Sequence, residues 1–231
     1  MSDTSNPPKL ASAAEFDARL KRTDEERWLA SRYSPAPDRE RLVAIYLLNQ
    51  ELQRALHTKE PMLGKIRLQW WRETLEQVAG AGPVRRHDLA EELARVTAGR
   101  PDLQAATLTL VDRYDDVLDD HFQAGGHQPG VDHEARHLAV EGALMKVASL
   151  ALHANATPEQ LAILASLGEA RLALSAELPD AVARWACARK AARKLPANLW
   201  PAILHLRDSV RPAGPLALRG QMFWRVITRR L

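Results

Sequence analysis

Residues 39–52 read RERLVAIYLLNQEL and open a strongly periodic segment. From there to residue 56, apolar side chains recur three and four positions apart, at Leu42, Ile45, Tyr46, Leu48, Leu52, Ala55 and Leu56. This spacing is typical of one face of an α-helix, so the segment is predicted to be a half-buried helix. Asp38 follows the helix-breaking stretch 34–37 and is predicted to be the N-cap of this helix.

Helix signals continue along the chain on both sides of this segment. Capping-box patterns, in which a hydroxyl side chain precedes an acid or amide by three residues, begin at Ser12, Thr23 and Thr157. Further helices are predicted at 65–78, 88–97, 102–122, 132–153, 157–176, 179–195, 197–208 and 215–227. Because no segment shows the alternation of a strand, the sequence predicts an all-α helical bundle. One domain is expected over residues 1–231, with residues 1–11 flexible.

The composition excludes several classes of protein. Of the 231 residues, 46% are hydrophobic and 26% charged, which allows a full core and is unlike a disordered chain. No apolar run reaches about 18 residues, and the first ten residues lack the basic and apolar blocks of a signal peptide. The single cysteine, Cys187, forms no internal disulfide. We therefore expect a cytoplasmic protein.

Charge is distributed unevenly along the chain. Residues 184–231 contain eleven Lys and Arg and one acid, Asp208, for a net charge of +10. The remaining residues contain 21 basic and 28 acidic side chains, for a net charge of −7. A basic C-terminal arm of this kind can bind nucleic acid or anionic lipid, or dock onto the acidic body. Its aromatic residues are spaced for helix cores rather than for base stacking, so nucleic acid is not favoured as a partner.

The last predicted helix, residues 215–227, mixes large apolar residues with arginines. Its apolar residues include Met222, Phe223, Trp224, Val226 and Ile227, and arginines lie at positions 219 and 225. Such a helix can lie in a membrane interface or dock onto the core of its own protein. The sequence leaves both possibilities open.

An acidic string at residues 112–120 reads DRYDDVLDD. On a helix it stacks Asp112, Asp116 and Asp120 on one face and Asp115 and Asp119 on the adjoining face. Clustered carboxylates of this kind can hold Mg²⁺ together with a substrate phosphate. The same string can instead be a solvated face, or one whose charge is offset by basic side chains such as those of the C-terminal arm. Asp115, Asp116 and Asp119 are accordingly candidate metal ligands.

Residues 39–52, followed by residues 60–72 (EPMLGKIRLQWWR), resemble the squalene/phytoene synthase family. That family has a helix ending in Ala-x-Tyr-Ala-Phe-Cys/Asn, a Pro-Gly turn and then Ile-Arg-Leu-x-Trp-Trp-Arg. A fainter likeness continues through residues 141–144, 167–170 and 191–201. The resemblance implies a bundle of the isoprenoid-synthase type, shortened near the C-terminus by about 45 residues.

The chain departs from this family where synthases bind metal. The resemblance places the acids of the first motif, Asp-Asp-x-x-Asp, at Gln53, Arg54 and His57. An amide, a cation and an imidazole do not replace carboxylates as ligands of a hard divalent ion. The acids of the second motif fall on Pro179 and Ala183. The resemblance therefore implies the scaffold of a synthase without its metal ligands.

Two hypotheses about the activity follow. The first is a family member without synthase activity, an accessory, assembly or lipid-binding factor that needs no cofactor. Residues 49–52 (NQEL) also resemble the branch of the family that contains a mitochondrial complex I assembly factor. Its expected partners are a protein or an isoprenoid or lipid ligand, with peripheral contact at the inner face of a membrane. The alternative is an active Mg²⁺-dependent head-to-head prenyltransferase that uses Asp115, Asp116 and Asp119.

The block that resembles the family supplies six candidate residues for binding a substrate or lipid: Tyr46, Asn49, Gln53, Arg67, Trp71 and Arg72. Tyr46 and Asn49 lie on the helix face where the resemblance places a cavity. Trp71 is expected to pack in the core with Trp70. Arg67 and Arg72 are expected either to bind an anionic head group or to form surface ion pairs with Glu73 or Glu76.

Overall fold

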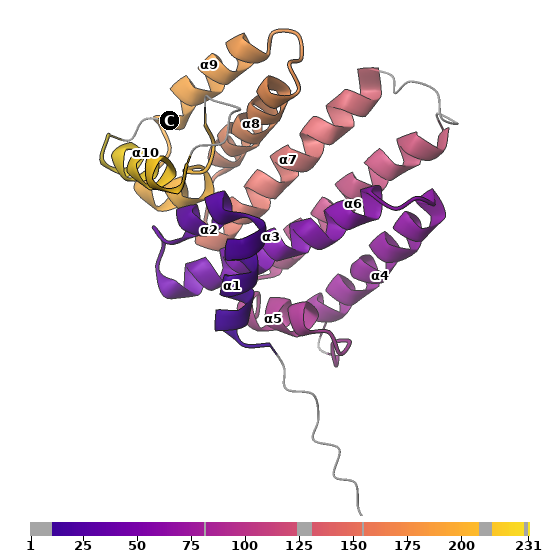
Figure 1. Ribbon diagram of the computed structural model, residues 1–231. Helices are drawn as coiled ribbons and strands as arrows, with labels where there is room; N and C mark the ends of the chain where they lie inside the picture. The colour runs from indigo at the N-terminus through magenta and orange to yellow at the C-terminus, as the bar shows by residue number, and fades with distance from the viewer. Residues whose placement is uncertain (1–10, 81, 124–130, 154, 208–213, 229–230) are drawn as a thin grey trace, which may run out of the picture.

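The computed structural model describes residues 11–80, 82–123, 131–153, 155–207, 214–228 and 231 (Figure 1). Within these ranges the chain forms ten α-helices, one 3-10 helix and no strand. The predicted all-α fold is therefore confirmed for the described residues, and the arrangement is consistent with a bundle of the isoprenoid-synthase type. Residues 1–10 of the segment predicted to be flexible lie outside the described residues.

The helices are α1 (Ala13–Thr23), α2 (Glu25–Ser31), α3 (Ala36–Leu56), α4 (Pro61–Ala79), α5 (Asp88–Val96), α6 (Pro101–Gln123), α7 (Val131–Leu152), α8 (Pro158–Ser175), α9 (Ala181–Ala192), the 3-10 helix η1 (Ala197–Ala202) and α10 (Pro215–Thr228). Helices α4, α6, α7, α8 and α9 pack side by side in that order. Helix α3 packs against α1, α4, α5, α6 and α7 (Figure 1). No described helix has both the length and the apolar character that crossing a membrane requires.

Helix α3 is more deeply buried than its sequence pattern predicts. Every side chain from Leu42 to Asn49 is buried, including Val43, Ala44 and Leu47, which lie off the predicted apolar face. The prediction of a half-buried helix is thus wrong for the first half of α3, because neighbouring helices cover it from several directions. The apolar side chains off the main stripe allow this enclosure.

Of the four predicted helix caps, two are confirmed and two are displaced. Ser12 and Thr157 each form a complete capping box. The cap of α2 is Asp24 rather than Thr23, since the Asp24 carboxylate accepts the backbone N–H of Arg27. Helix α3 begins at Ala36, ahead of the predicted cap Asp38, because a proline at position 37 needs no backbone hydrogen bond in the first turn.

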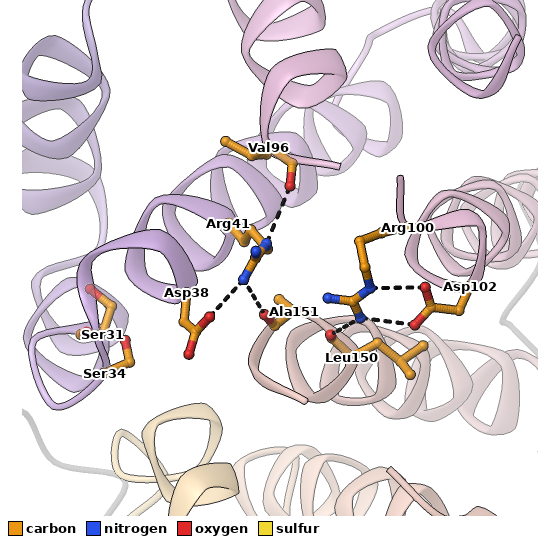
Figure 2. A network of polar contacts seen from close by, with 9 residues as sticks. All are labelled: Ser31, Ser34, Asp38, Arg41, Val96, Arg100, Asp102, Leu150 and Ala151. Atoms are coloured by element: carbon orange, nitrogen blue, oxygen red, sulfur yellow. Dashed lines mark hydrogen bonds and ion pairs between the residues drawn. The ribbon is translucent and has the colours of Figure 1, made fainter. Parts of the chain in front are cut away.

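Two arginines bind carbonyl groups near the C-terminal ends of helices (Figure 2). Arg41 of α3 donates to Val96 O at 3.3 Å and to Ala151 O at 3.4 Å, and pairs with Asp38. Arg100 donates to Leu150 O at 2.6 Å and binds both carboxylate oxygens of Asp102. Terminal carbonyls of a helix have no partner within the helix, so these guanidinium groups stabilise the ends of α5 and α7.

Helices α7 and α8 approach closely at two glycines. A Cβ atom on Gly168 would lie 2.5 Å from Met145 Cγ and 3.0 Å from the backbone oxygen of Glu141. A Cβ atom on Gly142 would lie 2.3 Å from a carboxylate oxygen of Glu169. Two of the three segments with the fainter family likeness, residues 141–144 and 167–170, therefore pack against each other. This contact places Glu141 beside the inner face of α8.

Candidate functional site

A pocket of about 230 Å³ lies where α2, α7, α8 and the segment after η1 meet. It is lined by Asp24, Glu26, Arg27, Glu141, Gly168, Arg171, Leu172, Ser175, His205 and Leu206. Two of the contributing segments, around Glu141 and Gly168, carry the fainter family likeness. This coincidence makes the pocket the candidate functional site.

Arg27 is the central charged group of the pocket. Its Nη1 atom lies 2.9 Å from Asp24 Oδ2, and its Nη2 atom lies 2.8 Å from Glu141 Oε1. The guanidinium also lies over the ring of Tyr46, 5.5 Å from the ring centre. Burial alone would lower the pKa of Arg27, but Glu141 and Asp24 outweigh it and raise this pKa above its usual range. Arg27 is thus a fixed cation that joins α2 to α7.

Two neutral polar side chains, Tyr46 and His205, lie next to this cation. Their rings meet edge to face with centres 6.3 Å apart. Among the described residues, neither ring nitrogen of His205 nor the Tyr46 hydroxyl has a hydrogen-bond partner. Burial lowers the pKa of His205, and Arg27, Arg171 and Arg225 lower it further. Burial also raises the pKa of Tyr46, against the influence of Arg27. The pocket therefore combines a fixed cation with a neutral imidazole at its wall and a protonated phenol beneath.

Asn49 and Gln53 occupy the next turns of the same face of α3. Asn49 is buried, and its Oδ1 accepts a hydrogen bond from the Tyr114 hydroxyl of α6 at 2.8 Å. Gln53 lies one turn later and is exposed. The structure therefore brings Tyr46 beside the pocket but uses Asn49 to join α3 to α6.

The three candidates on α4 lie in other surroundings. Trp71 is buried and meets the rings of Trp70 and His87 edge to face, as expected for a core residue. Arg67 is exposed and donates to the backbone oxygen of Arg54 at 3.1 Å. Neither Trp71 nor Arg67 lines the pocket at Arg27.

Arg72, the third of these candidates, faces the acidic string on α6. It forms ion pairs with Asp112 and Asp115 rather than with Glu73 or Glu76. Glu73 instead pairs with Arg85. The predicted alternative of a surface pair within α4 is therefore wrong in its partner, because the charge of α6 lies closer to Arg72.

Basic side chains offset the charge of the acidic string on α6. Lys65 Nζ of α4 lies 2.6 Å from Asp115 Oδ1 and 2.5 Å from Asp119 Oδ1. Arg113 binds Asp116 at 3.0 Å, and Arg136 of α7 binds Asp120 at 2.7 Å. Within the described residues these partners come from α4, α6 and α7. The alternative of an acidic face offset by basic side chains is therefore confirmed, with these helices rather than the C-terminal arm as the source.

The residues at the predicted metal positions do not fit Mg²⁺. Gln53, Arg54 and His57 on α3 offer no carboxylate. Burial would lower the pKa of Lys65, but its hydrogen bonds to Asp115 and Asp119 outweigh this effect and raise the pKa. A charged ammonium therefore lies between the two carboxylates. In the described parts of the chain, no group of three or more His, Cys, Asp or Glu side chains is arranged to hold a metal ion.

Sequence reasoning did not identify His205 or Glu141 as members of a site. His205 falls in the helix predicted at 197–208, but the structure ends this helix at Ala202, so His205 lies in the irregular segment that follows. Its partner Tyr46 is far away in the sequence. Glu141 is in a quoted segment, but nothing in its local sequence indicates a partner on α2. A signal was present for Arg27, since it immediately follows the acids of a capping-box pattern.

The family comparison covers the first half of the bundle. Residues 20–123 match the model of the squalene/phytoene synthase family. They extend from the last turns of α1 to the end of α6 and include the segments that carry the strongest sequence likeness. No curated protein and no solved structure gave a match. A segment of the squalene/phytoene synthase family is therefore present at residues 20–123.

Proposed function

From the squalene/phytoene synthase family segment at residues 20–123, we propose that this chain is a non-catalytic member of that family. In this proposal it acts as an accessory factor of the assembly-factor type and binds a partner or ligand without transferring a prenyl group. The helical bundle of the family would then serve to recognise that partner or ligand.

The observation that carries the proposal is the position of Lys65. Ionisation of a prenyl diphosphate develops negative charge on the leaving group, which metal ions must stabilise across a cavity. The string that reads Asp-Asp-x-x-Asp has its first and last carboxylates bound to the Lys65 ammonium. The family position on α3 carries Gln53, Arg54 and His57. The donor set therefore favours a structural role for these carboxylates.

The pocket at Arg27 supports a binding role. The Arg27 guanidinium in this pocket forms ion pairs with Asp24 and Glu141, and the volume of the pocket is about 230 Å³. This space accommodates a small polar group but is small for a ligand site, which more often occupies about 300–1,000 Å³. A long prenyl chain does not fit there without displacement of α7 or α8. The pocket is thus suited to recognition of a small polar group.

A turnover assay tests the proposal directly. The purified full chain is incubated with farnesyl or geranylgeranyl diphosphate, with and without Mg²⁺, and pyrophosphate release and condensed products are measured. We expect neither above the level of a blank without protein. Mg²⁺-dependent release of pyrophosphate that Asp116→Asn abolishes would instead establish the hypothesis of an active prenyltransferase.

A stability experiment separates the two roles of the carboxylates. If Asp115 serves to bind Lys65, the double-mutant cycle of Lys65→Met and Asp115→Asn should show a coupling of about 0.5–1 kcal/mol, since both groups are partly exposed. Mg²⁺ should leave the unfolding midpoint of the wild type unchanged. A rise in that midpoint with Mg²⁺, lost in Asp115→Asn, would contradict the structural role.

A further inference from the structure

The outward face of α10 is the largest group of exposed apolar side chains among the described residues. Phe223, Trp224 and Ile227 are 59%, 65% and 59% exposed. Leu218 and Met222 of the same helix are buried against the body. At about 100° per residue, the three exposed side chains share an arc of roughly 100° that is separate from the buried arc. The helix therefore has two apolar faces, and the described body covers only one.

Basic side chains lie next to the end of this helix. Arg189 and Lys190 of α9 and Arg193, the C-cap of that helix, line a hollow of about 310 Å³ together with Leu231. Leu231 follows the last residue of α10 by three positions, so the hollow lies within roughly 10 Å of the end of the helix. Lys190 and Arg193 are exposed. Figure 1 shows α9 and α10 at the same end of the molecule.

We propose that α10 binds the surface of an anionic lipid membrane and lies in its plane. Phe223, Trp224 and Ile227 would insert between the head groups, where aromatic and apolar side chains are stabilised. Lys190 and Arg193 would bind the lipid phosphates. Residues 184–231 carry a net charge of +10, which complements an anionic surface. This inference does not depend on whether the pocket at Arg27 is catalytic.

A second exposed apolar patch, on α4, serves as a contrast. Met62, Leu63 and Ile66 are 59%, 52% and 59% exposed. The neighbouring Lys65 is bound by Asp115 and Asp119, so the local charge is not free to attract phosphates. Apolar exposure is thus similar on the two helices, but the exposed Arg67 beside the α4 patch donates to the backbone oxygen of Arg54. We expect the α4 patch to contribute little to binding of anionic lipid.

Vesicle co-sedimentation of the full chain tests the proposal. Vesicles of phosphatidylcholine with about 30% phosphatidylglycerol are compared with pure phosphatidylcholine, and binding is repeated at about 0.5 M salt. We expect binding to the anionic vesicles that falls about ten-fold or more without phosphatidylglycerol or at high salt. The pair Trp224→Ser and Ile227→Ser should reduce it by about ten-fold or more as well.

Matched variants control for folding and for non-specific adhesion. Ile66→Ser removes the same side chain at the same exposure as Ile227→Ser. Because Ile66 lies on α4, away from the proposed membrane contact, this variant should change vesicle binding less than about two-fold. Lys190→Glu with Arg193→Glu should abolish the preference for anionic vesicles. Circular dichroism and thermal unfolding of each variant establish that it is folded.

Four results would overturn the proposal. The first is absence of binding to anionic vesicles at low salt, and the second is equal loss in the Ile66 and Ile227 variants. The third is a dimer in sedimentation velocity that Trp224→Ser dissociates, which would assign the face to a second copy of the chain. Retained binding by the folded Lys190→Glu and Arg193→Glu variant would remove the electrostatic part of the argument and count against it too.

Discussion

Arg27 and Glu141 are 114 residues apart in the sequence, yet their side chains meet at 2.8 Å between Nη2 and Oε1. Both side chains are largely buried, at 19% and 18% exposure. The pair connects α2, inside the family segment, to α7, which follows that segment. It therefore ties the two halves of the bundle together beside the candidate pocket.

Breaking this pair should destabilise the fold. Glu141→Gln leaves Arg27 with Asp24 as its remaining acidic partner, and Arg27→Met removes the guanidinium that both carboxylates bind. Each variant should therefore lower the free energy of unfolding by about 1–3 kcal/mol. Chemical denaturation measures the effect, and a double-mutant cycle should give a coupling above about 1 kcal/mol. The exposed pair Arg113 and Asp116 is the control and should couple by less than about 0.5 kcal/mol. Coupling at the control level in both pairs would contradict the prediction.

His205 should make the protein less stable in acid. An unfolded histidine has a pKa near about 6.5, and that of folded His205 lies well below it, so the unfolded state binds more protons between the two values. Stability is therefore fully present above the unfolded pKa and falls as the pH drops below about 6.5, by up to about 1.4 kcal/mol per unit.

His205→Phe keeps an aromatic ring against Tyr46 but removes the titration. The loss of stability between about pH 7.5 and 5.5 should therefore be smaller in this variant than in the wild type, as measured by urea unfolding at each pH. His57→Phe, at an exposed histidine, is the matched control and should retain the wild-type pH dependence. An unchanged slope in His205→Phe would show that other groups cause the acid sensitivity.

Gly64 should not tolerate a side chain. A Cβ atom there would lie 2.5 Å from the backbone oxygen of Ala55 and 2.9 Å from Leu118 Cδ2. Gly64→Ala should therefore cost about 1–3 kcal/mol of stability, because α3 and α4 must separate. Gly220→Ala on α10 meets no atom within 4 Å and should stabilise the helix by about 0.5–1 kcal/mol. Thermal unfolding distinguishes the two, and an equal response in both variants would refute the steric argument.

Arg100 should contribute to stability through its geometry as well as its charge. Its guanidinium binds both oxygens of Asp102 and the carbonyl of Leu150 at once, which an ammonium group cannot reproduce. Arg100→Lys should lose about 1 kcal/mol and Arg100→Met about 1–3 kcal/mol. Lys194→Met removes a highly exposed pair with Glu159 and should change stability by less than about 0.5 kcal/mol. Identical stability of the Lys and Arg forms at position 100 would show that charge alone suffices.

Local features of the fold were predictable because their causes are local. The capping boxes at Ser12 and Thr157 need only a hydroxyl and a partner three residues away, and both form. The pattern predicts too late a start for α3, because the first turn contains a proline, which is typical of a helix break. The burial of α3 was underestimated since periodicity reports one face and cannot count neighbouring helices.

The candidate site was less predictable because its contacts join distant segments. Clustering of the aspartates on α6 was visible, but the identity of their partners was not, since Lys65 and Arg72 lie on a different helix. The pocket at Arg27 likewise depends on how α2, α7 and the segment after η1 meet. The sequence contained the charges of the site, and only packing decided which of them are neighbours.

The enclosure of α3 also limits the ways in which this scaffold can change over evolutionary time. From Leu42 to Asn49 each new side chain must fit against several adjoining helices at once. A single substitution there therefore does not create a new binding cavity without loss of packing. Substitutions of exposed side chains cost far less stability, because they leave the packing of the interior unchanged. We expect homologues that diverge in role to differ first around the mouth of the bundle and along its terminal helix.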